Sequence, residues 1–110
     1  MNWQELTSLA QWAEVLQQSL NSPVAIFKHS TRCSISSMAK SRLEREWENN
    51  APSFPVYYLD LIQFRNVSNA IATDTGIEHQ SPQLIVLKNG KPVYHESHNM
   101  ISARQAVASV

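Results

Sequence analysis

The only cysteine of the chain, Cys33, is the residue best suited to chemistry. It follows the β-rich apolar run Val24 to Phe27 and a short polar segment, and residues that favour a helix come after it. This order predicts a thiol at a helix N-terminus, where unpaired N–H groups and the helix dipole favour the reactive thiolate. Ser36 stands three residues after Cys33, so the chain carries a one-thiol version of the Cys-x-x-Cys redox motif.

The polar side chains around this thiol could tune it or line a pocket. Arg32 is expected to help lower the pKa of the thiol, and His29, taken as a loop residue, to contribute little. Ser34 and Ser36 could hydrogen-bond the thiolate or cap the helix start. Thr31 could line the pocket or shape the turn. A lone cysteine can also be a small buried hydrophobe, so the context of the strand and the helix carries the catalytic interpretation.

Hydrophobic periodicity and turn residues predict the elements that would position these groups. Helices are expected up to Leu20 and over about Cys33–Glu48, Gln63–Thr75 and Ser102–Val110. Strands are expected at Val24–Phe27, Val56–Asp60, Leu84–Leu87 and Val93–His95. Gly76 is placed to end a helix, and Asn89-Gly90 predicts a hairpin between the last two strands.

The predicted helices have apolar faces that should turn toward the core. The first is expected to bury one broad face, made of Trp3, Leu6, Leu9, Ala10, Ala13, Leu16 and Leu20. The second is expected to bury Ile35, Met38, Ala39, Leu43 and Trp47.

This order of elements predicts an α/β fold of thioredoxin type, with a central mixed four-stranded sheet flanked by helices, in one domain over residues 1–110. In such folds a cis-proline at the start of the third strand packs beside the catalytic cysteine. The residue before that proline offers its backbone to a bound thiol or peptide. Pro82, preceded by Ser81, is in this position. We therefore predict a cis bond beside Cys33, with an ordinary trans proline as the alternative.

Composition narrows the range of partners. The 110 residues include nine Lys and Arg and nine Asp and Glu, so no electrostatic binding to nucleic acid or to an anionic membrane is expected. No apolar run reaches the ~20 residues that span a bilayer, and no basic residue precedes Lys28 as a signal peptide would require. One free thiol suits a reducing compartment, which predicts a cytoplasmic protein. The four histidines are scattered, so no metal site is expected.

The run from Phe27 to Ser36, together with Ser81-Pro82 and Asn89-Gly90, resembles the monothiol bacilliredoxins. These are small thioredoxin-like proteins of the bacillithiol system, and the resemblance covers essentially the whole chain. The Phe-Lys-His-Ser-Thr-x-Cys run is its most specific part. Ser34 stands where the family usually has proline, whereas Ile35 and Ser36 match.

The resemblance implies thiol-disulfide exchange with bacillithiol as thiol co-substrate and no tightly bound cofactor. Cys33 would attack an S-bacillithiolated client protein and take the bacillithiol onto itself. Because a single thiol cannot resolve its own mixed disulfide, bacillithiol or a partner reductase would then release it.

Three other functions remain as alternatives. The first is a thioredoxin-fold binding module with a buried, non-catalytic thiol, whose groove near Pro82 would hold a partner segment. A peroxiredoxin-like peroxidase is disfavoured, because that family spaces its pair as Thr-x-x-Cys after a proline, whereas Thr31 and Cys33 are two residues apart. An arsenate reductase would need an arginine soon after the cysteine, and Ser34 to Lys40 contains none.

Overall fold

A five-stranded mixed sheet organises the chain in the computed structural model, which describes residues 3–30, 34–50 and 54–110. Its strands, in the spatial order β1-β3-β2-β4-β5, are β1 (Trp3–Glu5), β3 (Val56–Asp60), β2 (Val24–His29), β4 (Gln83–Lys88) and β5 (Lys91–Ser97). The first three of these are parallel, whereas β4 runs antiparallel to β2 and β5 antiparallel to β4. The mixed sheet of the prediction is confirmed, with one strand more than expected.

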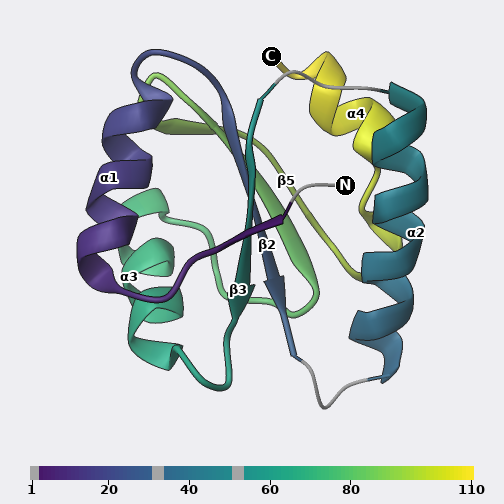
Figure 1. The fold of residues 1–110 in the computed structure, drawn as a ribbon, viewed down its shortest axis with the longest axis horizontal. Coiled ribbons are helices and arrows are strands. Elements are labelled where there is room, and N and C mark those ends of the chain that lie inside the picture. Colours follow the sequence, from purple (N-terminus) through teal and green to yellow (C-terminus); the bar gives the residue numbers. More distant parts are fainter. Residues whose placement is uncertain (1–2, 31–33, 51–53) are drawn as a thin grey trace.

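Helices cover both faces of this sheet (Figure 1). On one side lie α1 (Leu9–Ser19) and α3 (Arg65–Thr75), and on the other lie α2 (Ser34–Asn50) and α4 (Ala103–Ala108). A short 3-10 helix, η1 (His98–Met100), follows β5 and precedes α4. Successive side chains of β2 point to opposite faces of the sheet, so the strand contributes to the core on both sides. Val24 and Ile26 pack with α1 and α3, and Ala25 and Phe27 pack with α2 and α4.

The N-terminal segment corrects the prediction of one long first helix. Trp3 begins a strand that pairs with Val56 of β3, and its ring packs against Phe27 and Tyr58. This pairing and packing are long-range interactions, which override the helical periodicity of the local sequence. The helix starts only at Leu9, where the Ser8 hydroxyl accepts a hydrogen bond from the backbone N–H of Gln11 at 3.1 Å.

The buried faces of α1 and α2 also differ in part from the prediction. On α1 the buried residues are Trp12, Val15 and Ser19. The predicted burial of four residues is wrong, because they are exposed: Leu9, Ala10, Ala13 and Leu20, which follows the helix. On α2 Leu43 and Trp47 are buried as expected, but Met38 is 72% exposed. The expectation that Met38 faces the core is therefore wrong.

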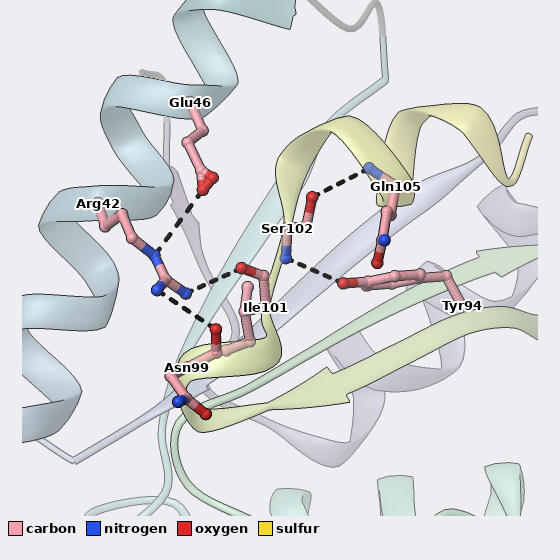
Figure 2. Close-up of polar contacts among 7 residues, drawn as sticks. All are labelled: Arg42, Glu46, Tyr94, Asn99, Ile101, Ser102 and Gln105. Carbon is pink, nitrogen blue, oxygen red and sulfur yellow. Dashed lines mark hydrogen bonds and ion pairs between the residues drawn. The ribbon is translucent and has the colours of Figure 1, made fainter.

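Local turn signals are confirmed. Gly76 ends α3 with a φ of 72°, and Asn89 and Gly90 both have positive φ in the turn between β4 and β5. Ser102 caps α4 by accepting a hydrogen bond from the backbone N–H of Gln105 at 3.2 Å, as drawn in Figure 2. Among the described residues no helix has the length and apolar character that crossing a membrane requires.

Candidate functional site

The predicted catalytic segment is bracketed by a strand and a helix. β2 ends at His29, and α2 begins at Ser34. The predicted order of strand, short connection and helix is thus present on both sides of position 33. Thr31, Arg32 and Cys33 lie outside the described residues, as does the side chain of Ser34. Their predicted roles therefore remain predictions.

Ser36 links the two ends of this bracket. Its hydroxyl oxygen lies 2.6 Å from Nδ1 of His29 and accepts a hydrogen bond from the backbone N–H of Ser30 at 3.2 Å. The side chain is completely buried. Ser36, which stands where a Cys-x-x-Cys motif has its second cysteine, therefore ties the first turn of α2 to the end of β2. The sequence did not predict this contact.

His29 is a strand residue with a buried side chain, which corrects its assignment to a loop. Its ring stacks on Phe27 and also contacts Tyr58. Burial lowers the pKa of His29, and the charge of Lys40 lowers it further, while Asp60 and Ser36 act in the opposite direction. A lowered pKa favours the neutral form of the His29 ring, which carries no positive charge. Because Ser36 already accepts from Ser30, its own proton is free to be donated to Nδ1 of the neutral ring.

The Ser81-Pro82 bond is cis, as predicted. Pro82 is buried, and its carbonyl accepts a hydrogen bond from the backbone N–H of His98 at 3.0 Å. The hydroxyl of Ser81 is buried and has no hydrogen-bond partner among the described residues. Because position 33 is outside the described residues, the predicted contact between Pro82 and Cys33 stays a prediction.

A buried lysine near the end of β2 lies on the face of the sheet that α1 and α3 cover. Lys28 is fully buried, and its ammonium group donates to the backbone carbonyl of Ser68 on α3 at 3.3 Å. Burial lowers its pKa to about 8. Its directly opposed neighbour on β4 is Gln83, whose side-chain oxygen is buried with no partner among the described residues. Sequence reasoning missed this group, because a lysine in a short strand usually reaches solvent.

A hydrogen bond extends this polar group to His79, an exposed residue. The hydroxyl of Ser68 lies 3.2 Å from Nδ1 of His79. Burial lowers the pKa of His79, and the charges of Lys28 and Arg65 add to the effect. Across residues 3–30, 34–50 and 54–110, histidine and acidic side chains form no group of three that could hold a metal ion.

Solved structures share this architecture. A thioredoxin-fold protein described as a proposed oxidoreductase is 29% identical, with a TM-score of 0.83, and the match covers 97% of this chain and 92% of that one. Thioredoxin from Fasciola hepatica is 13% identical with a TM-score of 0.74, and 96% of each chain is covered. Oxidised mitochondrial thioredoxin 3 from Saccharomyces cerevisiae is 14% identical with a TM-score of 0.70 over 96% of this chain and 93% of that one. The thioredoxin-like fold expected from the order of elements is thus confirmed.

The family comparison agrees with the motif. A family model described as monothiol bacilliredoxin BrxC matches residues 4–106. This span includes both sides of the Cys33 segment, Ser36 and the cis peptide bond before Pro82. Members of this group and the thioredoxin-fold oxidoreductases act in thiol redox chemistry, which fits a chain with a single thiol between a central strand and a helix. The chain therefore belongs to the monothiol bacilliredoxin family.

Proposed function

We propose that this protein is a monothiol oxidoreductase that removes bacillithiol from S-bacillithiolated client proteins, with Cys33 as the attacking residue. The observation that carries the proposal is the single cysteine of the chain, which lies between the end of β2 and the start of α2. The family match over residues 4–106 supports it. Activity is expected in the cytoplasm, where thiols stay reduced.

The reaction needs two exchange steps. The Cys33 thiolate attacks the bacillithiol sulfur of the mixed disulfide, the client leaves as a thiolate that takes up a proton, and a Cys33–bacillithiol disulfide remains. A second thiolate, from free bacillithiol or a partner reductase, then attacks the bacillithiol sulfur of that disulfide. This step releases Cys33 and forms a new disulfide with the incoming thiol.

Ser36 cannot take the place of that second thiol. Its hydroxyl is buried, and its contacts are to His29 and to the backbone of Ser30. A serine forms no disulfide, so each turnover depends on an external thiol. We propose that Ser36 supports the site by fixing the start of α2, and that Thr31, Arg32, Ser34, Ser81 and Pro82 line the site or stabilise the thiolate.

Removal of bacillithiol from a modified client protein tests the proposal, with intact-mass spectrometry as the readout. Cys33→Ala should abolish removal, and the wild-type protein should acquire an adduct of the mass of bacillithiol on Cys33. The pH dependence of alkylation by iodoacetamide should show a midpoint below the free-cysteine value of about 8.5. Removal at the wild-type rate by Cys33→Ala would instead support a binding module with a non-catalytic thiol.

A second variant tests the dependence on external thiol. Ser36→Cys restores a Cys-x-x-Cys motif, so an internal disulfide should form and the required concentration of external thiol should fall. Ser41→Cys is the matched control, because it adds a thiol to an exposed position of the same helix outside that spacing. Equal behaviour of the two variants would show that spacing from Cys33 has no influence.

A further inference from the structure

A basic groove lies between α2 and η1. It has a volume of about 310 Å³, and its lining residues are Met38, Ala39, Arg42, Arg45, His98 and Asn99. A neighbouring depression shares two of these residues, Met38 and Arg45, and adds Ser37 and Ser41. The exposed thioether of Met38 therefore forms an apolar surface beside the arginines.

The two arginines of the groove differ in how they are held. Arg42 is fixed: its guanidinium donates to the carbonyls of Ile101 at 2.8 Å and Asn99 at 3.4 Å, and it pairs with Glu46 at 3.8 Å (Figure 2). Arg45 is exposed and has no hydrogen bond or ion pair with another described residue. None of the six lining residues is acidic. The groove is thus complementary to an anion, and Arg45 has its donors available.

The groove is connected to the start of α2 and to the cis peptide bond before Pro82. Met38 comes one helical turn after Ser34, the first residue of α2, and Arg42 and Arg45 come about 12 Å and about 17 Å along the helix from it. Because side chains on a helix tilt toward its N-terminus, those of Arg42 and Arg45 lean toward the start of α2. On the other wall, His98 donates its backbone N–H to the carbonyl of Pro82.

We propose that this groove, which we name the α2–η1 groove, binds the carboxylate-bearing part of the small thiol that Cys33 exchanges. The inference rests on the proposed function and names how its co-substrate is recognised. Arg45 pairs with the carboxylate, the fixed guanidinium of Arg42 adds positive potential, and Met38 contacts the apolar atoms of the ligand. Bacillithiol has the required chemistry, because its malyl group carries carboxylates.

The size of the groove favours a small thiol over a segment of the client protein. Pockets for small ligands begin at about 300 Å³, and this groove lies at that lower limit. A client contact would instead extend over a much larger surface. The exposed guanidinium of Arg45 lies beside the apolar side chain of Met38, which suits a small ligand with both a carboxylate and apolar atoms.

Binding of two thioethers that cannot exchange disulfides tests this inference independently of turnover. The probes are S-methyl bacillithiol and S-methyl cysteinyl-glucosamine, which lacks the malyl group, with affinities measured by calorimetry. Arg45→Gln should weaken binding of the first probe by about five- to tenfold and that of the second by less than twofold. His98→Asn, which retains a residue tolerant of the positive φ of 55° at this position, should have a smaller effect in the same direction. Lys91→Gln is the matched control. It removes a positive charge at the start of β5, outside the groove, and should leave both affinities unchanged.

The outcomes separate this inference from the proposed function. If Arg45→Gln weakens binding of the malyl-bearing probe alone, the groove is supported as a carboxylate site. This holds even if the Cys33→Ala experiment shows that the protein does not remove bacillithiol from clients. If Arg45→Gln weakens binding of both probes equally, or of neither, the proposal that the groove binds a carboxylate is wrong. Slower reaction of Arg45→Gln with an acidic bacillithiolated client, at unchanged probe affinity, also overturns it and assigns the groove to the client.

Discussion

At the scale of single residues, Ser36 has a structural role that its position in the motif does not reveal. It holds together the two ends of the segment that contains Cys33, through one bond to a ring and one to the backbone. Both partners are buried, so water cannot replace the hydroxyl at low cost. The serine occupies the position of the second cysteine in a Cys-x-x-Cys motif, and its hydroxyl contributes to the stability of the site.

Ser36→Ala should lower the free energy of unfolding by about 1–3 kcal/mol, because a buried N–H and a ring nitrogen lose their partner. Denaturation with urea measures this, and Ser41→Ala on the exposed side of the same helix is the control. We also expect bacillithiol removal to slow without being lost, since Ser36 performs no exchange step. Equal stability of the two variants would contradict a structural role for the Ser36 hydroxyl.

At the scale of elements, the sequence predicts best what is encoded locally. The turn at Asn89-Gly90 and the helix end at Gly76 depend on backbone angles that few residues adopt, so their sequence signals are strong. The strand from Trp3 to Glu5 depends on pairing with a strand more than 50 residues away. No local pattern reports such pairing, which is why a helix was expected there.

The candidate site divides in the same way. Motif spacing predicts a cis bond before Pro82 and a helix that starts near Cys33. The structure has both the cis bond and a helix that begins at Ser34. The contact between His29 and Ser36 joins the two sides of the segment and could not be derived from spacing. The exposure of Met38 also differs from the prediction. Helical periodicity places Met38 on the apolar face, but in the structure it lines an open groove between α2 and η1.

Gly76→Ala tests the helix end directly. Space is available for the added methyl group, since no atom lies within 4 Å of it, but the φ of 72° disfavours any side chain. The expected loss is about 1 kcal/mol in the free energy of unfolding, measured by urea denaturation. Gly76→Asn is the control, because asparagine adopts this conformation more readily and should lose less. An equal loss in both variants would show that backbone conformation does not explain the effect.

At the scale of the whole molecule, the burial of Lys28 couples stability to pH. Its pKa is about 8 in the folded protein and about 10.5 when the chain is unfolded. Between these values the unfolded chain binds more protons than the folded chain, so the contribution of Lys28 to the free energy of unfolding rises with pH. Near pH 7 both states are protonated, and the buried charge is destabilising.

Lys28→Met should therefore be more stable than the wild-type protein at pH 7, by about 1–3 kcal/mol. This advantage should shrink as pH rises from 8 to 10. Urea denaturation at a series of pH values measures it, and Lys88→Met, at an exposed position of β4, is the control. A constant difference between Lys28→Met and wild type across that range would show that Lys28 is not the titrating group.

The central position of β2 has a consequence for how the protein opens. All six residues of β2 are buried, and the strand is paired on both sides, whereas β1 pairs on one side only through three residues. Amide hydrogens of Ile26 and Phe27 should exchange with solvent deuterium only when the whole molecule unfolds, while those of β1 should exchange through local fraying. Cys33 follows, by a few residues, the strand that we expect to exchange most slowly. If Cys33 is the attacking thiol that we propose, the strand before it stays folded while the thiol meets a large client protein.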